Sequence, residues 1–169
     1  MNKKGFTLLE LIVVIAIISL LTSIILASLS TSRAKANDTA IKSNLTQIKN
    51  AAGLQYENMK GCYSNINAPC SAISPAVVQA GGCPGTGVPN IFGYPQIASF
   101  INSATTSGSG LASCASTLGG RDYAVAVQYK TTTAKGWCVD SSGKSKEVTI
   151  NPDNTQGGID STVNGGHCN

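Results

Sequence analysis

The chain has 169 residues, of which only 12% are charged, and a formal net charge of +4. Two of the positive charges, Lys3 and Lys4, lie at the extreme N-terminus, so the remaining balance is too weak to argue for nucleic acid or anionic lipid as the main partner. This length fits one domain plus one membrane segment. The many Gly, Ser, Thr and Asn residues after position 60 favour a small, loop-rich extracytoplasmic domain over a cytosolic enzyme.

All the cysteines lie beyond residue 60, and their number is even. The six are Cys62, Cys70, Cys83, Cys114, Cys138 and Cys168. The tight C-x-x-C pair of a zinc site is missing, so the pattern favours disulfides, which form in an oxidising compartment. The spacing alone does not choose among the connectivities.

Residues 6–29 form a segment of 24 residues whose only charge is Glu10. As a helix it would be about 36 Å long, enough to cross a hydrocarbon core of about 30 Å. The segment contains neither Gly nor Pro, and its Ser and Thr hydroxyls can bond to the helix's own carbonyls. We therefore predict a transmembrane helix.

A cleaved secretory signal peptide is one alternative, with Lys3 and Lys4 as its basic region and Ala34-Lys35-Ala36 as its cleavage site. Against it, the apolar stretch is longer than the usual limit of about 15 residues, and Glu10 lies inside it. Arg33 and Lys35 also crowd the cut.

An ordinary single-pass anchor is a second alternative. It gives no reason for Glu10, which is costly in lipid without a partner. The basic residues on the two sides of the segment balance each other, so they do not set its orientation.

The sequence KKGFTLLELIVVIAII at residues 3–18 resembles the prepilin signature of type IV pilins and type II secretion pseudopilins. This resemblance covers about the first tenth of the chain. It implies that a prepilin peptidase cuts between Gly5 and Phe6, that Phe6 is then N-methylated, and that Glu10 is the family's glutamate with a role in assembly. It also implies an α+β, pilin-like fold, in which a long N-terminal helix packs on a small antiparallel sheet with disulfide-stapled loops.

The physical chemistry of Glu10 agrees with this role. After cleavage the carboxylate lies near the first turn of the helix, where the helix dipole favours a negative charge. The Phe6 amino group of a neighbouring subunit is a suitable cation. Such a buried pair adds little net stability but fixes the register between apolar helices. The simpler alternative is that Glu10 only extends toward the lipid headgroups.

We expect the helix to continue through residues 30–60. Ala34, Ile41, Leu45, Ile48 and Ala52 recur on one face, which predicts packing on the C-terminal domain rather than a coiled coil. Many major pilins carry a proline in the membrane half, whereas this chain has none between residues 6 and 60. A major pilin, a minor pilin and a pseudopilin therefore all remain open.

We call residues 61–169 the head. It divides into a loop-rich region at residues 61–120 and an antiparallel sheet with a C-terminal loop at residues 121–169. We expect short helices at 74–80 and 95–103, turns at 81–87, and strands at 123–130, 137–140 and 147–150. The alternation in 123–130 predicts a half-buried strand. We pair Cys114 with Cys138, because the first strand lies between them, and expect a bond from Cys168 to hold the tail, as pilins commonly do.

Catalysis has little support. The single histidine, His167, lies in a Gly-rich terminus, and paired cysteines leave no free thiolate. We expect no enzyme activity, no cofactor and no small-molecule substrate. Asp153, Asn154 and Asp160 are candidate calcium ligands but lack the spacing of an EF-hand and are equally typical of turns, so no metal is expected.

Four lysines near the strands offer a nucleic-acid surface, but a solvated sheet edge explains them as well, since aromatic platforms are few. These are Lys130, Lys135, Lys144 and Lys146.

The function we predict is a structural filament subunit with residues 1–5 as leader, 6–29 as membrane and filament-core helix, and 30–60 as its amphipathic half. The alternatives are a type II secretion pseudopilin and a non-polymerising, membrane-anchored binding domain. The expected partners are other copies or related pilins, a prepilin peptidase, an inner-membrane assembly platform and, before assembly, the membrane. The precursor would cross the cytoplasmic membrane once with its C-terminal domain outside, and the mature form would lie in a surface pilus or a periplasmic pseudopilus.

Overall fold

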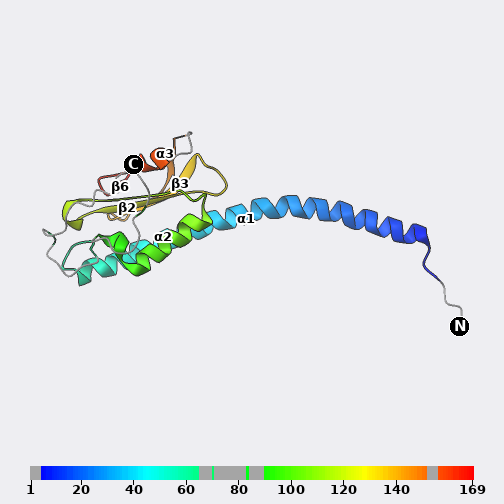
Figure 1. Ribbon diagram of the computed structural model, residues 1–169, viewed down its shortest axis with the longest axis horizontal. Helices are drawn as coiled ribbons and strands as arrows, with labels where there is room; N and C mark the ends of the chain where they lie inside the picture. The colour runs from blue at the N-terminus through cyan, green and yellow to red at the C-terminus, as the bar shows by residue number, and fades with distance from the viewer. Residues whose placement is uncertain (1–4, 65–69, 71–82, 84–89, 152–155) are drawn as a thin grey trace.

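A computed structural model describes residues 5–64, 70, 83, 90–151 and 156–169. One helix, α1 (Leu8–Asn58), runs through 51 residues, and a small head packs on its C-terminal half (Figure 1). The N-terminal half of α1 projects away from the head with nothing beside it (Figure 1). The predicted long helix is confirmed, and it begins at Leu8 because Thr7 is its N-cap.

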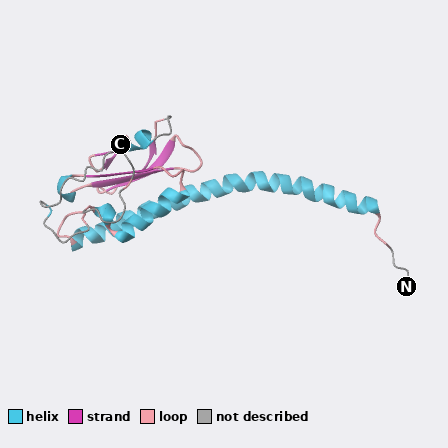
Figure 2. Ribbon diagram, viewed as in Figure 1, coloured by secondary structure: helices cyan, strands magenta, loops and turns pink. Residues whose placement is uncertain are grey.

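The head contains a four-stranded antiparallel sheet in the order β1-β2-β3-β4 (Figure 2). The strands are β1 (Ala112–Ser116), β2 (Tyr123–Gln128), β3 (Lys135–Asp140) and β4 (Ser145–Thr149). The predicted α+β, pilin-like fold is confirmed. The strand β1 was not predicted, because Ala-Ser-Cys-Ala-Ser lacks the β-branched and aromatic residues typical of strands.

One core lies between the sheet and the helices. Ile41, Leu45, Ile48 and Ala52 of α1 are fully buried, which confirms that the apolar face of the amphipathic half packs on its own domain. A second helix, α2 (Pro95–Ser107), lies beside α1, and a short 3-10 turn, η2 (Ile91–Gly93), precedes it. The sheet contributes alternate residues of β2 and its end, namely Tyr123, Val125, Val127 and Tyr129.

A second core lies on the opposite face of the sheet. The C-terminal segment covers this face with the short elements α3 (Gln156–Asp160), β5 (Val163–Asn164) and β6 (His167–Cys168). Ala124 and Ala126 are therefore as buried as their neighbours. The prediction of a half-buried strand at 123–130 is wrong, because the face that carries these small alanines is covered by protein rather than by solvent.

The cysteines form three disulfides, Cys62–Cys70, Cys83–Cys114 and Cys138–Cys168. The predicted Cys114–Cys138 pair is wrong. Cys114 lies opposite Val125 and Cys138 opposite Ala126, and neighbouring residues of β2 point to opposite faces of the sheet. The two cysteines therefore belong to different cores.

Some predictions fall outside the described residues. These are the helix at 74–80, the turns at 81–87 apart from Cys83, and the ligand candidates Asp153 and Asn154. Asp160, the third ligand candidate, is the last residue of α3.

Candidate functional site

The N-terminus of α1 is held by a reciprocal pair of side chains, Thr7 and Glu10. The Glu10 amide donates to the Thr7 hydroxyl oxygen (3.3 Å), while Glu10 Oε2 accepts from the Thr7 amide and the Thr7 hydroxyl (both 2.8 Å). This capping box satisfies backbone donors that the first turn of a helix leaves free. The Thr-x-x-Glu spacing was visible in the sequence, but the role of Thr7 was missed.

The residues just before the cap are open to solvent. Phe6 is 83% exposed, and a Cβ added at Gly5 would meet no atom within 4 Å. Glu10 itself is exposed on the first turn. The peptide between Gly5 and Phe6, the Phe6 side chain and the Glu10 carboxylate therefore lie together at an accessible end of the chain.

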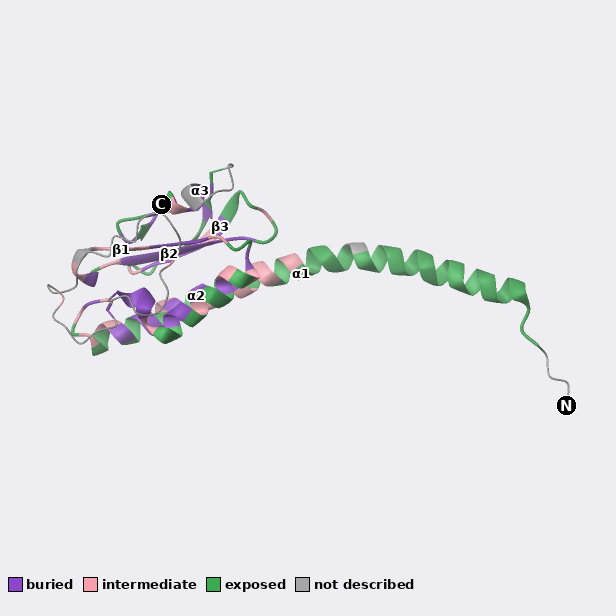
Figure 3. Cartoon of the chain, in the orientation of Figure 1, coloured by how far each residue is buried: buried purple, intermediate pink, exposed green. Residues whose placement is uncertain are grey.

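From Leu8 to Leu29, every side chain of α1 whose burial is described is exposed, and most of these side chains are apolar (Figure 3). The exposed fraction of its large apolar side chains lies between 42% at Leu29 and 75% at Leu8. Within the described residues, Leu54 is the only large apolar side chain this exposed outside 6–29. A helix that is apolar all round is stable when lipid or other protein covers it.

The polar residues of this segment do not interrupt it. The hydroxyls of Ser19, Thr22 and Ser23 donate to carbonyls four residues earlier at 2.7, 2.7 and 2.9 Å. Their hydrogen-bonding capacity is thus used within the helix. Among the described residues, α1 is the helix whose length and composition would allow it to cross a membrane, a property that it shares with N-terminal signal sequences.

The head offers no comparable surface among the residues that the structure describes. No group of three or more His, Cys, Asp or Glu side chains there could hold a metal ion. His167 is exposed on β6, and Lys135 is paired with Glu147 at 2.6 Å. The rings of Tyr129 and Trp137 lie under the Lys42 ammonium, so they are not free platforms for bases.

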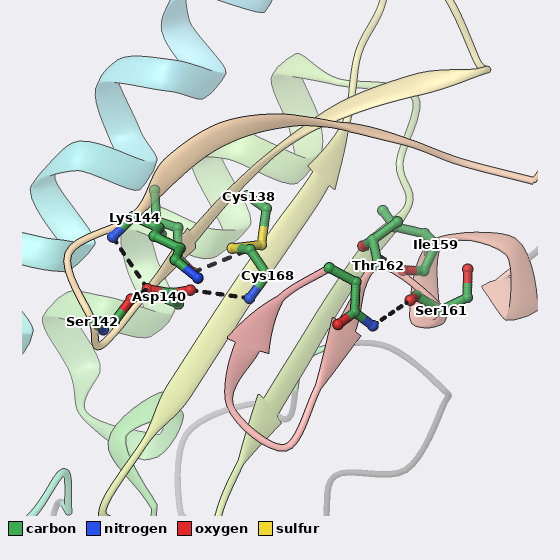
Figure 4. Close-up of a disulfide and its surroundings, with 10 residues drawn as sticks. Cys138, Asp140, Ser142, Lys144, Ile159, Ser161, Thr162 and Cys168 are labelled. Carbon is green, nitrogen blue, oxygen red and sulfur yellow. Dashed lines mark hydrogen bonds between the residues drawn. A yellow bond between two sulfur atoms is a disulfide. The ribbon is translucent and has the colours of Figure 1, made fainter.

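The most connected polar group of the head is Asp140, which is fully buried at the end of β3 (Figure 4). Its carboxylate accepts from the Ser142 hydroxyl (2.6 Å) and from the amides of Ser142 (3.0 Å), Lys144 (3.2 Å) and Cys168 (3.0 Å). Burial acts to raise the pKa of Asp140, but these four hydrogen bonds outweigh it and hold the pKa below its ordinary value. Asp140 therefore joins the β3–β4 turn to the C-terminal segment beside the Cys138–Cys168 bond.

The structure thus has a pilin-like α+β fold, and the N-terminal half of its long helix is exposed. Comparisons with known proteins agree. Residues 1–26 match the family model of the prokaryotic N-terminal methylation motif. The chain is also similar to the type IV wide pilus major component PilA4 of Thermus thermophilus, with 48% identity over 44 residues. The resemblance of the N-terminus to type IV pilins is thus confirmed.

The similarity is confined to part of each protein. It covers 26% of this chain and 34% of PilA4, so the match spans about a third of that relative's length. No solved structure matches the chain.

Proposed function

We propose that the chain is the structural subunit of a type IV pilus-like filament. A prepilin peptidase removes residues 1–5, Phe6 is N-methylated, and subunits assemble through the apolar helix of residues 6–29. One observation carries this proposal: the exposed apolar half of α1 follows directly on a matching methylation motif and has its single carboxylate in the first turn.

The capping box suggests how Glu10 works in assembly. Both hydrogen bonds that its carboxylate accepts from Thr7 use Oε2, so within the described part of the chain Oε1 keeps room for a further donor. Cleavage at Gly5 creates an ammonium group at Phe6, and this group on a neighbouring subunit supplies that donor. Because the pair forms among apolar helices, it sets their axial register rather than adding much stability.

We further propose a membrane topology, an assembly route and a role for the filament. The precursor spans the cytoplasmic membrane once, with residues 30–169 outside, and an inner-membrane platform takes up the mature subunit. The filament then serves adhesion, motility, DNA uptake or secretion. The second candidate function is a type II secretion pseudopilin, which uses the same helix in a short periplasmic assembly. The reason for retaining it is that residues 6–60 lack the proline that many major pilins carry in the membrane half of this helix.

Replacing Glu10→Ala in the full chain tests the role in assembly. Filaments recovered from the cell surface, or from the periplasm for a pseudopilus, should fall by at least about tenfold, as expected when a buried charge loses its partner. The amount of membrane-inserted protein should not change. Glu57→Ala, which removes an exposed carboxylate near the other end of α1, is the matched control and should assemble normally.

Normal filaments from the Glu10→Ala variant would contradict the proposal. In an anchored binding domain that does not polymerise, this substitution would leave membrane insertion and binding unchanged. That alternative would be favoured if the unaltered chain formed no polymer at all.

A further inference from the structure

The head is attached to α1 by a row of charged side chains as well as by its core. The first of them, Asp38, reaches the β2–β3 turn more than 90 residues away. Its Oδ1 accepts from the amides of Lys130 (2.7 Å) and Thr131 (3.4 Å), and its Oδ2 accepts from the Thr131 hydroxyl. One carboxylate thus accepts hydrogen bonds from two backbone amides and one hydroxyl of the turn, and its charge strengthens these bonds.

Two lysines continue the row along α1. The Lys42 ammonium lies 4.7 Å from the centre of the Trp137 ring and 5.4 Å from that of Tyr129. Farther along, Lys49 Nζ donates to the carbonyl of Gly143 at 3.0 Å. Residues 38, 42 and 49 are spaced by four and seven, so they share one flank of the helix. We call this row the clasp.

The clasp and the core act differently. Apolar burial is proportional to area and has little directional preference, so the stripe from Ile41 to Ala52 holds the head on the helix without fixing its rotation or tilt well. Hydrogen bonds have preferred distances and angles and do fix it. The helix α2 packs against α1 as well (Figure 1). The clasp adds directional contacts from the sheet and its turns.

Asp38 has a special place in this row. It lies one turn before Ile41, the first fully buried residue of α1 in the core, and about 14 Å along the helix from Leu29, where the exposed apolar segment ends. The Asp38 bonds are therefore the clasp contact nearest to the assembling segment. A loose contact at this point would let the whole head pivot relative to that segment.

We propose that Asp38 is a positioning residue that fixes the angle between the head and the assembling helix, so that copies of this chain pack with one repeat. This inference rests on the proposed filament function. In a helical polymer every subunit makes the same contacts, so a head that samples several angles must be ordered at each addition, and this ordering costs free energy. The Asp38 contacts order the head before assembly.

The test compares filaments of full-length variants by yield and by electron microscopy of their helical order. Asp38→Ala should reduce the yield roughly tenfold, the size expected for a charge-assisted contact, or broaden the distribution of rise and twist. Asp38→Asn keeps an acceptor oxygen for the Lys130 amide and should restore much of the yield. Thermal unfolding in detergent should show a folded head in both variants.

A second variant covers the case in which Asp38→Ala does not accumulate. Thr131→Val removes only the hydroxyl donor and leaves the two backbone bonds, so the chain should fold and form less regular filaments. Filaments of wild-type yield and order from a folded Asp38→Ala or Thr131→Val chain would overturn the inference while leaving the filament function intact. If the unaltered chain forms no polymer at all, the proposed function itself fails.

Discussion

Two carboxylates, Glu10 and Asp140, illustrate how differently the same group is used in this chain. Glu10 is exposed, bonds to its own helix cap and keeps room for a partner. Asp140 is fully buried, and four hydrogen bonds from three residues surround it. The first is suited to an intermolecular contact, and the second stabilises the fold of a single head.

The hydrogen bonds of Asp140 make stability depend on pH. They hold its folded-state pKa below the value of about 3.9 that an unfolded chain shows. A depressed pKa contributes stability that is fully present above the unfolded pKa and is lost as pH falls through the folded one. The melting temperature of the full chain in detergent should therefore be steady from pH 7 to about 5 and should fall below about 4.

The variant Asp140→Asn should melt lower at pH 7, because it replaces a charged acceptor, and should lose less on acidification. Glu57→Gln, on the exposed end of α1, should follow the wild-type curve. Parallel acid curves for Asp140→Asn and the wild type would show that Asp140 does not carry the pH dependence.

At this scale the sequence was informative where the chemistry is local. Glu10 is conspicuous as the one charge in residues 6–29, and its cap lies three residues away. Asp140 was not singled out: three of its four hydrogen bonds come from the turn that follows it, but the fourth comes from Cys168, 28 residues later in the chain. Pairing of this kind depends on tertiary structure that no local pattern encodes.

Among the helices and strands, too, those that local sequence patterns specify were predicted, and those that depend on tertiary contacts were not. The long helix, α2 and the strands β2, β3 and β4 were predicted, the long helix and β2 from apolar periodicity and β3 and β4 from short runs bounded by turn residues. The strand β1 and the C-terminal cover were not, since a run of small residues becomes a strand only when β2 pairs with it. The wrong Cys114–Cys138 pair has the same origin, because it required knowing which face of the sheet each cysteine occupies.

The disulfides allow a comparison between elements. Cys138–Cys168 closes a separation of 30 residues and Cys62–Cys70 one of 8. By loop entropy their removal should cost about 3.6 and about 2.5 kcal/mol, respectively. Removal of the longer one by Cys138→Ser with Cys168→Ser should also loosen the cover over Ala126 and Val148.

Denaturant unfolding of the two double-serine variants measures these costs, and limited proteolysis should cut the C-terminal segment only when Cys138–Cys168 is missing. A greater loss from removing Cys62–Cys70 would contradict the order expected from loop entropy, and a C-terminal segment that resists proteolysis without Cys138–Cys168 would show that this bond is not needed to hold the cover.

The molecule as a whole has one part that buries its apolar side chains, the head with the second half of α1, and one part that leaves them exposed, the first half of α1. Within the described residues, both cores begin at or after Ile41, so the head buries its own apolar groups. The first half of α1 contributes nothing to either core and leaves its apolar side chains exposed (Figure 3). A helix that is apolar all round is stable when lipid or other protein covers it, which agrees with the proposed membrane-inserted precursor and its assembly into a filament.

The most direct test of this account is the mass of the N-terminal peptide of the mature protein, isolated from the assembled fraction. We predict that the peptide begins at Phe6 and carries one added methyl group on its amino nitrogen. A peptide that begins at Asn37 would show removal of the whole apolar segment by a signal peptidase, and one that begins at Met1 or Asn2 would show no processing at Gly5. Either result would contradict a filament subunit assembled through residues 6–29.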